Sequence, residues 1–251
     1  FKIGSMYKVP LVDLRLKMNY STGQKNPTFI ERFGFFVPDS STSRFEGNSN
    51  LKPEKAVGWQ IGLERNFLNN QVFMSATWFR DKLDDEINGF AARSDGIFTA
   101  LNVQGTSLRE GLEFSVATQF PRGFSIQTNY TYLDATELDS VTGRRLDEVR
   151  RPRHSANLVT NWVSPGRKIE FSTFIRHSGE FFDLDFSQFP SARTKLKDYT
   201  LVGFNLSYGV SKFLRTFLRV ENALDEHYEE IIGFKAPGMA ANIGIILSYG
   251  D

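Results

Sequence analysis

Two aspartates in one aromatic segment, together with a histidine nearby in the chain, are the residues whose types and spacing could do chemistry. Asp183 and Asp185 stand two positions apart in "EFFDLDFSQFPSAR", residues 180–193, a spacing at which two carboxylates can share an oxygen-seeking cation such as calcium. Two carboxylates are too few to make a calcium site alone. His177 with either aspartate is the one combination that resembles a water-activating pair for peptide hydrolysis. The chain has no glycine-rich phosphate loop, zinc motif or nucleophile elbow, which argues against an enzyme.

Aromatic side chains in the long polar segments are better candidates for ligand binding than for catalysis. Segment 180–193 concentrates phenylalanines beside its aspartates, and further aromatics stand in residues 21–54 and 223–238. Such rings offer apolar contact area, although loop aromatics more often pack within their own loop. The candidate ligand contacts are Phe35, Phe36, Arg44, Phe181, Phe182, Asp183, Asp185, Phe186, Tyr228 and Phe234.

Composition excludes several classes of protein. The 251 residues include 30 basic and 29 acidic side chains, for a net charge of +1, and no cysteine. Without a basic excess there is no electrostatic drive toward nucleic acid, so we expect no nucleic-acid partner. The sequence contains no run of about 18 apolar residues, so it predicts no transmembrane helix. The opening "FKIGSMYKVP" does not have the pattern of a signal peptide. We expect no cofactor beyond the calcium considered above.

Alternation with a period of two is the dominant pattern, and it predicts β-strands. In residues 107–120, "SLREGLEFSVATQF", one parity is mainly apolar while the other is small or polar, which is typical of a strand with two different surroundings. Many of these segments exceed ordinary globular strands and match the about 9–11 residues of a tilted membrane-crossing strand. The ten predicted strands are residues 11–20, 55–67, 70–82, 107–120, 123–134, 150–163, 167–179, 198–209, 213–222 and 239–249.

The connections between these strands alternate between short turns and long polar segments. The turns are 68–70, 121–123, 164–167 and 209–212, and the long segments are 21–54, 83–106, 135–149, 180–197 and 223–238. Loops sorted by length to opposite ends of a sheet are typical of outer-membrane barrels, which have short periplasmic turns and long extracellular loops. Aromatic residues near the short turns predict an interfacial girdle. They are Phe67, Phe120, Phe124, Trp162, Tyr208, Phe213 and Tyr249.

The polar positions of the alternating strands include charged residues. These residues would not be stable in a water-free core, because burying an unpaired charge is strongly unfavourable. A water-filled or plugged lumen with lipid outside removes that cost. A soluble barrel would instead turn the charges outward around an apolar interior, and alternation alone does not say which side is in. The residues predicted to line a lumen are Arg15, Glu64, Arg109, Glu113, Arg215 and Arg219.

Five segments carry motifs that occur together, and in this order, in one family. They are "NPTFIERFGFF" (26–36), "GNSNLKPEKAVGWQIGLE" (47–64), "REGLEFS" (109–115), "RRPRHSANL" (150–158) and "RVENALDEHYEEIIGFKAPG" (219–238). They resemble the C-terminal half of the barrel of TonB-dependent outer-membrane receptors, nearest to those for vitamin B12 or iron-siderophores. The chain departs from the family pattern at Met239, where arginine is usual, and after Tyr249, where the family ends on an aromatic residue.

The resemblance implies an all-β fold, an antiparallel transmembrane β-barrel. Residues 1–251 would then be about ten C-terminal strands of a barrel of about 22 strands. The N-terminal plug domain is expected to be absent from this chain, and the remaining barrel half to come from other sequence. The implied location is the outer membrane of a Gram-negative bacterium.

The function that the resemblance implies is active import. Extracellular loops would bind a scarce nutrient chelate, an iron-siderophore or cobalamin, and TonB would supply energy through the missing N-terminal segment. Outer-membrane lipids, lipopolysaccharide and the barrel-assembly machinery are the other implied partners. The alternatives are a self-contained ten-stranded outer-membrane protease and a soluble β-barrel binding protein.

One basic segment adds a possible anion site. "TGRRLDEVRRPRH", residues 142–154, contains Arg144, Arg145, Arg150, Arg151 and Arg153. These arginines are predicted to bind lipopolysaccharide phosphates or an anionic siderophore, or else to form a solvated rim paired with neighbouring carboxylates.

Overall fold

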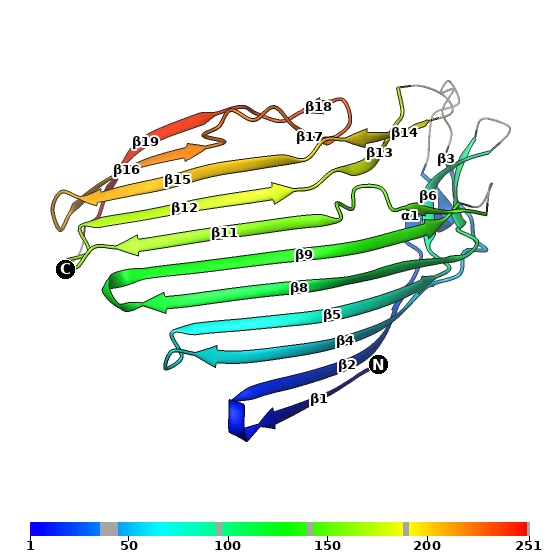
Figure 1. The fold of residues 1–251 in the computed structure, drawn as a ribbon. Coiled ribbons are helices and arrows are strands. Elements are labelled where there is room, and N and C mark those ends of the chain that lie inside the picture. Colours follow the sequence, from blue (N-terminus) through cyan, green and yellow to red (C-terminus); the bar gives the residue numbers. More distant parts are fainter. Residues whose placement is uncertain (36–44, 94–96, 140–142, 188–190, 250–251) are drawn as a thin grey trace.

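The main element of the computed structural model, which describes residues 1–35, 45–93, 97–139, 143–187 and 191–249, is one curved antiparallel sheet. Its strands follow one another in chain order (Figure 1). In spatial order they are β1 (Lys2–Val9), β2 (Leu14–Lys25), β4 (Glu54–Phe67), β5 (Val72–Asp84), β8 (Thr106–Phe120), β9 (Phe124–Leu138), β11 (His154–Val163), β12 (Ile169–Ser178), β15 (Tyr199–Gly209), β16 (Leu214–Glu221) and β19 (Ala240–Leu247). The short strand β10 (Arg145–Asp147) pairs with the end of β9. The sheet is open, with β1 and β19 at its edges.

The predicted antiparallel wall is confirmed, and each of the ten predicted strands is present with somewhat different ends. Strand β1 is additional, and it pairs with β2 from Lys2 opposite Ser21 to Val9 opposite Leu14. The alternation does not predict β1 because a polar residue, Ser5, interrupts its apolar parity.

Short and long connections lie at opposite ends of the sheet (Figure 1). The tight reversals use left-handed backbone: Leu68, Asn69 and Asn70 have φ of 51°, 55° and 67°, a region that asparagine tolerates better than most residues. The 3-10 turns η1 (Pro10–Val12) and η2 (Pro121–Gly123) each begin with proline, whose fixed φ suits a turn's first position. We refer to these two ends below as the turn end and the loop end.

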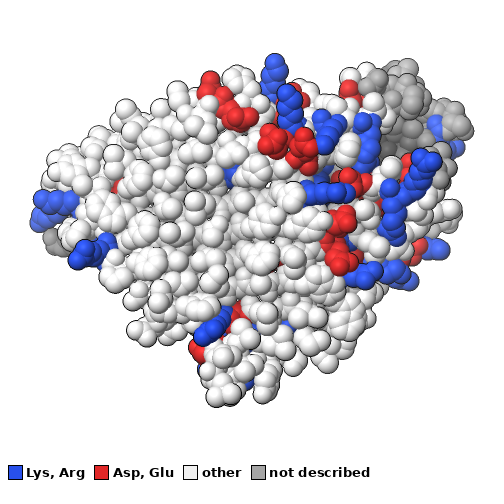
Figure 2. Space-filling model, viewed as in Figure 1, with Lys and Arg blue, Asp and Glu red and all other residues white. Residues whose placement is uncertain are grey.

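The two faces of the sheet differ in polarity. Residues directly opposite in an antiparallel ladder share a face, and Leu63, Ala76, Phe114 and Tyr130 form one such row across four strands. The neighbouring row on the other face is Glu64, Ser75, Ser115 and Asn129. Large apolar side chains are exposed along the first face, and Figure 2 shows a broad uncharged band over the middle of the strands. We call these the apolar face and the polar face.

Two belts of aromatic residues bound the apolar face. At the turn end, Phe120, Phe124, Trp162 and Phe171 are successive partners across four strands. Toward the loop end the second belt contains Tyr20, Trp59, Trp78 and Tyr132. From Phe124 to Tyr132 strand β9 covers about 27 Å along its axis, which after a typical tilt approaches the apolar band of a membrane barrel.

On the polar face, three phenylalanine rings lie over glycines of the neighbouring strand. Phe79 lies opposite Gly111, and the other two pairs are Phe174 with Gly203 and Phe217 with Gly244. A Cβ built on Gly111 would overlap both the Phe79 ring and the carbonyl oxygen of Tyr132. The glycine is therefore required by a close approach of ring and backbone, as in the aromatic shielding of strand glycines.

We expect Gly111→Ala to lower the free energy of unfolding by about 1–3 kcal/mol, because the carbonyl of Tyr132 can yield only if the strands shift. Urea unfolding of the intact protein in micelles measures the change. Gly23→Ala is the matched control, since a Cβ there would meet only the Cβ of Ala56 at 3.8 Å, an ordinary contact. Equal stabilities of the two variants would contradict the argument.

The long connections contain short elements that the sequence predicted as loops. A three-stranded sheet, in the order β3 (Phe45–Glu46), β7 (Phe98–Asn102), β6 (Ile87–Ala92), packs around Phe45, Leu51 and Ala100. The helix α1 (Phe29–Phe33) precedes it. Two hairpins, β13 (Phe181–Asp185) with β14 (Ala192–Leu196) and β17 (Glu229–Ile231) with β18 (Phe234–Lys235), complete the loop end (Figure 1).

None of the helices in the described part of the chain is long and apolar enough to cross a membrane.

Candidate functional site

Three long connections meet at the carboxylate of Asp183. Its Oδ1 accepts hydrogen bonds from Nε of Arg150, at 2.7 Å, and from the backbone N–H of Leu184, at 2.9 Å. Its Oδ2 accepts from the backbone N–H of Ile232, at 2.9 Å. The Asp183 side chain is 1% exposed. Hairpin β13–β14, the segment before β11 and the final loop are thus joined by one buried charge.

These donors decide the charge state of Asp183. Burial alone would raise the pKa of its carboxyl group, but the hydrogen bonds from Ile232, Arg150 and Leu184 outweigh burial and hold the pKa below its usual range. Asp183 is therefore an anion at neutral pH. Arg150, Leu184 and Ile232 each donate a hydrogen bond to its carboxylate oxygens.

The lowered pKa of Asp183 predicts how the junction responds to acid. A carboxylate with a depressed folded pKa adds stability that is complete above its unfolded pKa, about 3.9, and is lost as pH falls through the folded value. After correction for intrinsic exchange, hydrogen-exchange protection of the Ile232 amide should stay constant from about pH 8 to about pH 5. A loss of protection already at pH 6 in the intact protein would contradict this assignment.

A second cluster holds the last hairpin against β15. The hydroxyl group of Tyr199 donates to Oε1 of Glu230 at 3.0 Å, and Arg176 pairs with the same oxygen at 3.1 Å. The rings of Tyr199 and Tyr228 lie 4.4 Å apart. Tyr228 is therefore half buried and packs on Tyr199, and ligand contact by its exposed part stays a prediction.

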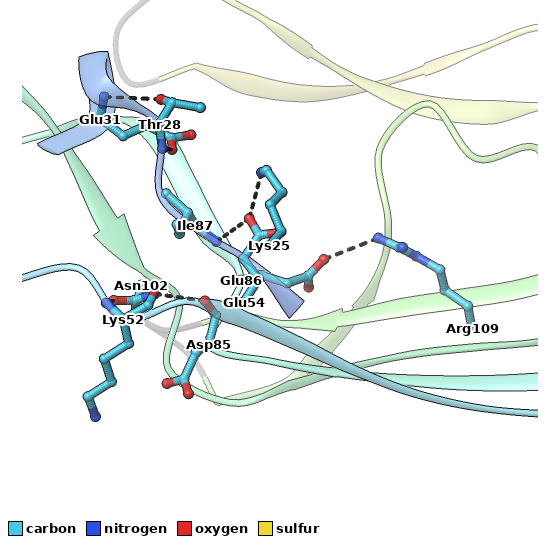
Figure 3. A network of polar contacts seen from close by, with 10 residues as sticks. All are labelled: Lys25, Thr28, Glu31, Lys52, Glu54, Asp85, Glu86, Ile87, Asn102 and Arg109. Carbon is cyan, nitrogen blue, oxygen red and sulfur yellow. Dashed lines mark hydrogen bonds and ion pairs between the residues drawn. The ribbon is translucent and has the colours of Figure 1, made fainter. Parts of the chain in front are cut away.

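The segment "GNSNLKPE" is fastened to the connection between β5 and β8 (Figure 3). The amide group of Asn102 accepts from the backbone N–H of Lys52 and donates to the backbone oxygens of Lys52 and Asp85. Oε1 of Glu54 accepts from the Ile87 N–H at 3.0 Å and from Lys25 at 2.9 Å. These contacts give the motif a structural role, because they align β4 with the small loop sheet.

Arg109 connects that loop sheet to the segment before β11. Its Nε lies 3.0 Å and 2.9 Å from the two oxygens of Glu148, and its Nη2 donates to Glu86 at 3.1 Å (Figure 3 shows the Glu86 contact). Glu148 also pairs with Arg151 at 3.6 Å. The arginine of "REGLEFS" thus bridges two loops from the polar face.

The motif "NALDEHY" closes the final loop upon itself. Asn222, with a left-handed φ of 47°, accepts from the Glu226 N–H and donates to the carbonyl oxygens of Glu226 and Pro237. Oδ1 of Asp225 accepts from the Met239 N–H at 2.8 Å. The loop is therefore a closed structure that anchors the β16–β19 hairpin.

The predicted ligand contacts divide into buried and exposed residues. Phe181 is buried, and Phe182 lies under the guanidinium group of Arg193. Phe35 stacks on Phe45 with ring centroids 5.3 Å apart, but its side chain is exposed. Phe186 and Phe234 are each 73% exposed. Phe36 and Arg44 lie outside the described residues. As candidate contacts, Phe186 and Phe234 present open rings at the loop end, whereas Phe181 and Asp183 are inaccessible.

The predicted lumen-lining residues all lie on the polar face, as the ladder registers place them. Glu64 pairs with Arg15 at 3.6 Å and also with Lys17. Arg215 pairs with Glu170 at 2.9 Å, and Arg219 with Glu221. Their shared face is a geometric fact, and contact with a lumen stays a prediction for these residues: Arg15, Glu64, Arg109, Glu113, Arg215 and Arg219.

The calcium and protease hypotheses do not fit the described residues. Arg150 and two backbone N–H groups occupy the oxygens of Asp183, so a cation would have to displace three donors. No group of three or more potential ligand side chains of the kind that holds a metal occurs in the described ranges. His177 shares a 2.9 Å hydrogen bond with Thr200 on the apolar face and makes no described contact with Asp183.

The basic segment forms mostly ion pairs. Arg153 pairs with Asp147 at 3.0 Å, and Arg150 and Arg151 pair with Asp183 and Glu148. This arrangement fits the paired rim that the sequence offered as an alternative. Binding of lipopolysaccharide by these arginines stays a prediction.

Sequence reasoning named Arg150 only as a member of the basic segment, and it did not find the pairings that organise the loop end. Arg150, Arg176, Tyr199 and Glu230 act through partners that lie more than a loop away in the chain. Single-residue types and local spacing carry no signal for such pairs.

Comparison with known proteins finds relatives along nearly the whole chain. The family model described as "TonB dependent receptor-like, beta-barrel" matches residues 1–223. The vitamin B12 transporter BtuB of Vibrio cholerae is 26% identical over 230 residues, which are 92% of this chain and 34% of that protein. BtuB of Photobacterium profundum is 28% identical over 223 residues, 86% of this chain and 32% of that protein. The chain thus spans about a third of the length of these relatives.

Solved structures share the fold. The siderophore receptor PirA from Acinetobacter baumannii has a TM-score of 0.75 at 20% identity, over 99% of this chain and 40% of that one. The ferric-catecholate import receptor Fiu from E. coli K12 has a TM-score of 0.72 at 20% identity, over 98% of this chain and 34% of that one. These relatives are transporters and receptors rather than enzymes.

Proposed function

The chain belongs to the TonB-dependent receptor β-barrel family of the Gram-negative outer membrane, and from this premise we propose that it forms wall, lumen lining and loops of a receptor that imports a scarce nutrient. The observation that carries the proposal is the sidedness of the sheet. One face is apolar between two aromatic belts, and the other carries paired charges. Lipid suits the first face and a hydrated lumen suits the second.

The loop end is the proposed ligand-binding side. The Asp183 junction and the Arg109 bridge join connections that are distant in the chain, so the loops form a positioned surface rather than separate flexible segments. Phe186 and Phe234 are the proposed apolar contacts on it, because both rings are exposed. The names of the relatives suggest two ligand classes, cobalamin and ferric siderophores.

Energy and completion of the barrel would come from outside this chain. In the proposed receptor, TonB acts on a plug domain, and further strands continue the wall from the open edges at β1 and β19. The barrel-assembly machinery would insert the complete receptor.

The test uses the full-length receptor. Equilibrium binding to cobalamin and to ferric catecholate and hydroxamate siderophores is measured in micelles, and uptake is measured in cells with and without TonB. We expect one ligand class to bind, and its uptake to require TonB. Failure of all three classes to bind, or uptake that persists without TonB, would refute the proposal.

The loop contacts are tested in the same assay. Phe186→Ala with Phe234→Ala should weaken binding about tenfold or more, as for exposed aromatic anchors. Leu224→Ala, an exposed apolar residue in the final loop, is the control and should leave affinity unchanged. An unchanged affinity of the double variant would remove both phenylalanines from the ligand site.

A further inference from the structure

A hollow of about 490 Å³ lies at the turn end of the sheet, between the neighbouring turns 164–168 and 210–213. Strand residues that line it show which way it faces. Arg215 lies opposite Gly209 on the polar face, and by the same alternation Lys168 lies on that face. The hollow therefore opens on the side of the sheet that the proposed function gives to the lumen.

The hollow is positively charged. Arg167, Lys168 and Lys212 line it and are exposed, and none of its described lining residues is an aspartate or a glutamate. A fourth cation in the lining, Arg215, is already paired with Glu170 at 2.9 Å. No ion pair of Arg167, Lys168 or Lys212 occurs in the described part of the chain. Three positive charges without counter-charge favour an anionic occupant.

Hydrogen bonds fix the two turns that form the hollow. The guanidinium group of Arg215 donates to Oγ of Ser207 at 3.0 Å and to the carbonyl oxygen of Arg167 at 3.4 Å. Oγ of Ser211 accepts from the backbone N–H of Phe213 at 3.2 Å. The basic side chains thus extend from a positioned frame, which lowers the entropic cost of binding.

A second cavity, of about 420 Å³, lies on the same face next to the hollow and farther from the turns. A row of successive ladder partners on the polar face lines it: Asn161, Ser172, Asn205 and Arg219. Glu170 also lines it, and the ion pair of Glu170 with Arg215 joins the two cavities. Because Arg219 is paired with Glu221, the charges of this second cavity are balanced.

The two cavities give the polar face a charge gradient toward the turn end. The first part of the path offers amide and hydroxyl groups with paired charges, and the last part offers unpaired cations. An anion gains favourable electrostatic energy along this direction, whereas a neutral solute gains none. Both volumes lie within the about 300–1,000 Å³ of small-molecule pockets. The arrangement therefore suits a small anion that moves along the lumen.

We propose that the hollow between the turns 164–168 and 210–213 is an exit site for the imported nutrient, and that this nutrient is an anionic ferric chelate of the catecholate class. The inference rests on the proposed function and deepens it, because it selects one ligand class and adds a site on the path. Phenolate oxygens make a ferric catecholate an anion, whereas the ferric hydroxamate core and cyanocobalamin carry no net charge. Arg167, Lys168 and Lys212 contact those oxygens, and the hydroxyl group of Ser248 adds a donor.

The test is ¹⁹F NMR of the full-length receptor in micelles, with a trifluoromethyl tag on one introduced cysteine, Gly166→Cys. Gly166 lines the hollow, and a Cβ there would meet no atom within 4 Å. Iron(III) broadens only nearby resonances, and the loop end lies beyond the about 27 Å that separate the aromatic belts. A chelate captured by the loops therefore leaves the tag signal narrow.

We expect a ferric catecholate to broaden the tag signal in a saturable way and a ferric hydroxamate to leave it unchanged. The gallium(III) catecholate has the same charge but is diamagnetic, so it should displace the ferric complex without broadening. Added salt should weaken the binding, because the cations are exposed.

Lys168→Gln/Lys212→Gln should raise the Kd of the ferric catecholate at least about tenfold, which corresponds to about 1.4 kcal/mol, because charge-assisted contacts are lost. The matched control is Lys8→Gln/Arg122→Gln. It removes the same charge from exposed positions at the turn end that do not line the hollow, and it should leave the Kd unchanged. Thermal unfolding verifies that both variants are folded.

The proposal is overturned by equal Kd values in the two double variants or by equal broadening from the ferric hydroxamate. Absence of broadening by the ferric catecholate also overturns it, and would indicate that another anion, such as an acidic segment from the rest of the receptor, fills the hollow. Displacement by millimolar inorganic phosphate would leave an unselective anion site only.

Nutrient capture at the loop end is measured separately, by equilibrium binding to the untagged receptor. Capture of cobalamin or of a ferric hydroxamate would sustain the import proposal and overturn the anionic exit site. Absence of binding by every nutrient class would refute the import proposal, whatever the tag at the turn end reports.

Discussion

Asp183→Asn should release the final loop from the β13–β14 hairpin. The amide group of asparagine would turn an N–H₂ toward one of the donors that now meet Asp183, and Arg150 would lose its counter-charge. Breaking a buried ion pair from one side costs about 3–5 kcal/mol, and we expect about 3 kcal/mol because Arg150 is 48% exposed. Local opening should therefore accelerate amide exchange at Ile232 about 100-fold, while the strands of the wall keep their protection.

Glu180→Gln is the matched control for this variant. Glu180 pairs with Lys195 in the same hairpin, but both side chains are half exposed, and such surface pairs contribute about 0–1 kcal/mol. Exchange at Ile232 should change little. Equal protection of Ile232 in the unaltered protein and in the Asp183→Asn variant would show that Asp183 does not hold the loops together.

Leu158→Arg should lower the stability of the wall in a bilayer by about 2–4 kcal/mol, the effect of a cation facing lipid near mid-depth. Leu158 lies opposite Thr128 and Ile175 on the apolar face, between Trp162 in one aromatic belt and the level of Tyr132 in the other. Reversible urea unfolding of the full-length receptor in vesicles, followed by tryptophan fluorescence, measures the loss.

Gln127→Arg tests the opposite face at a similar depth. Gln127 lies opposite Ala117 and Val159 on the polar face and is exposed there, so an arginine would meet water rather than lipid. Its effect should stay within about 0.5 kcal/mol, as for other surface substitutions. A larger loss for Gln127→Arg than for Leu158→Arg would reverse the assignment of the two faces.

The wall could be predicted from sequence because its signal is local and repeated. Each long strand contains enough residues to show its alternation, and each tight turn carries proline, glycine or asparagine. Strand β1 was not predicted because the polar residue Ser5 interrupts the apolar positions of its alternation. The strands β3, β7, β13 and β17 were not predicted, because strands of two to five residues are too short to show a recognisable alternation.

The candidate site could be predicted only in part, for a different reason. The aspartate spacing at 183 and 185 is compatible with a cation or with an arginine, and the sequence does not say which. The answer depends on Arg150, which is 33 positions away and reaches Asp183 only after β11 and β12 have paired. Likewise, alternation separates two faces of the sheet without saying which of them faces water. Family membership together with the aromatic belts favours lipid on the apolar face and water on the polar face.

Because β8 and β9 pair without interruption from Leu108 opposite Thr136 to Phe120 opposite Phe124, deleting a single residue midway would invert every side chain that follows in that ribbon. Deleting two residues would shorten the ribbon, and each remaining side chain would stay on its original face, apolar or polar. Homologous walls should therefore differ in length by even steps, while their outer connections can lengthen by any number.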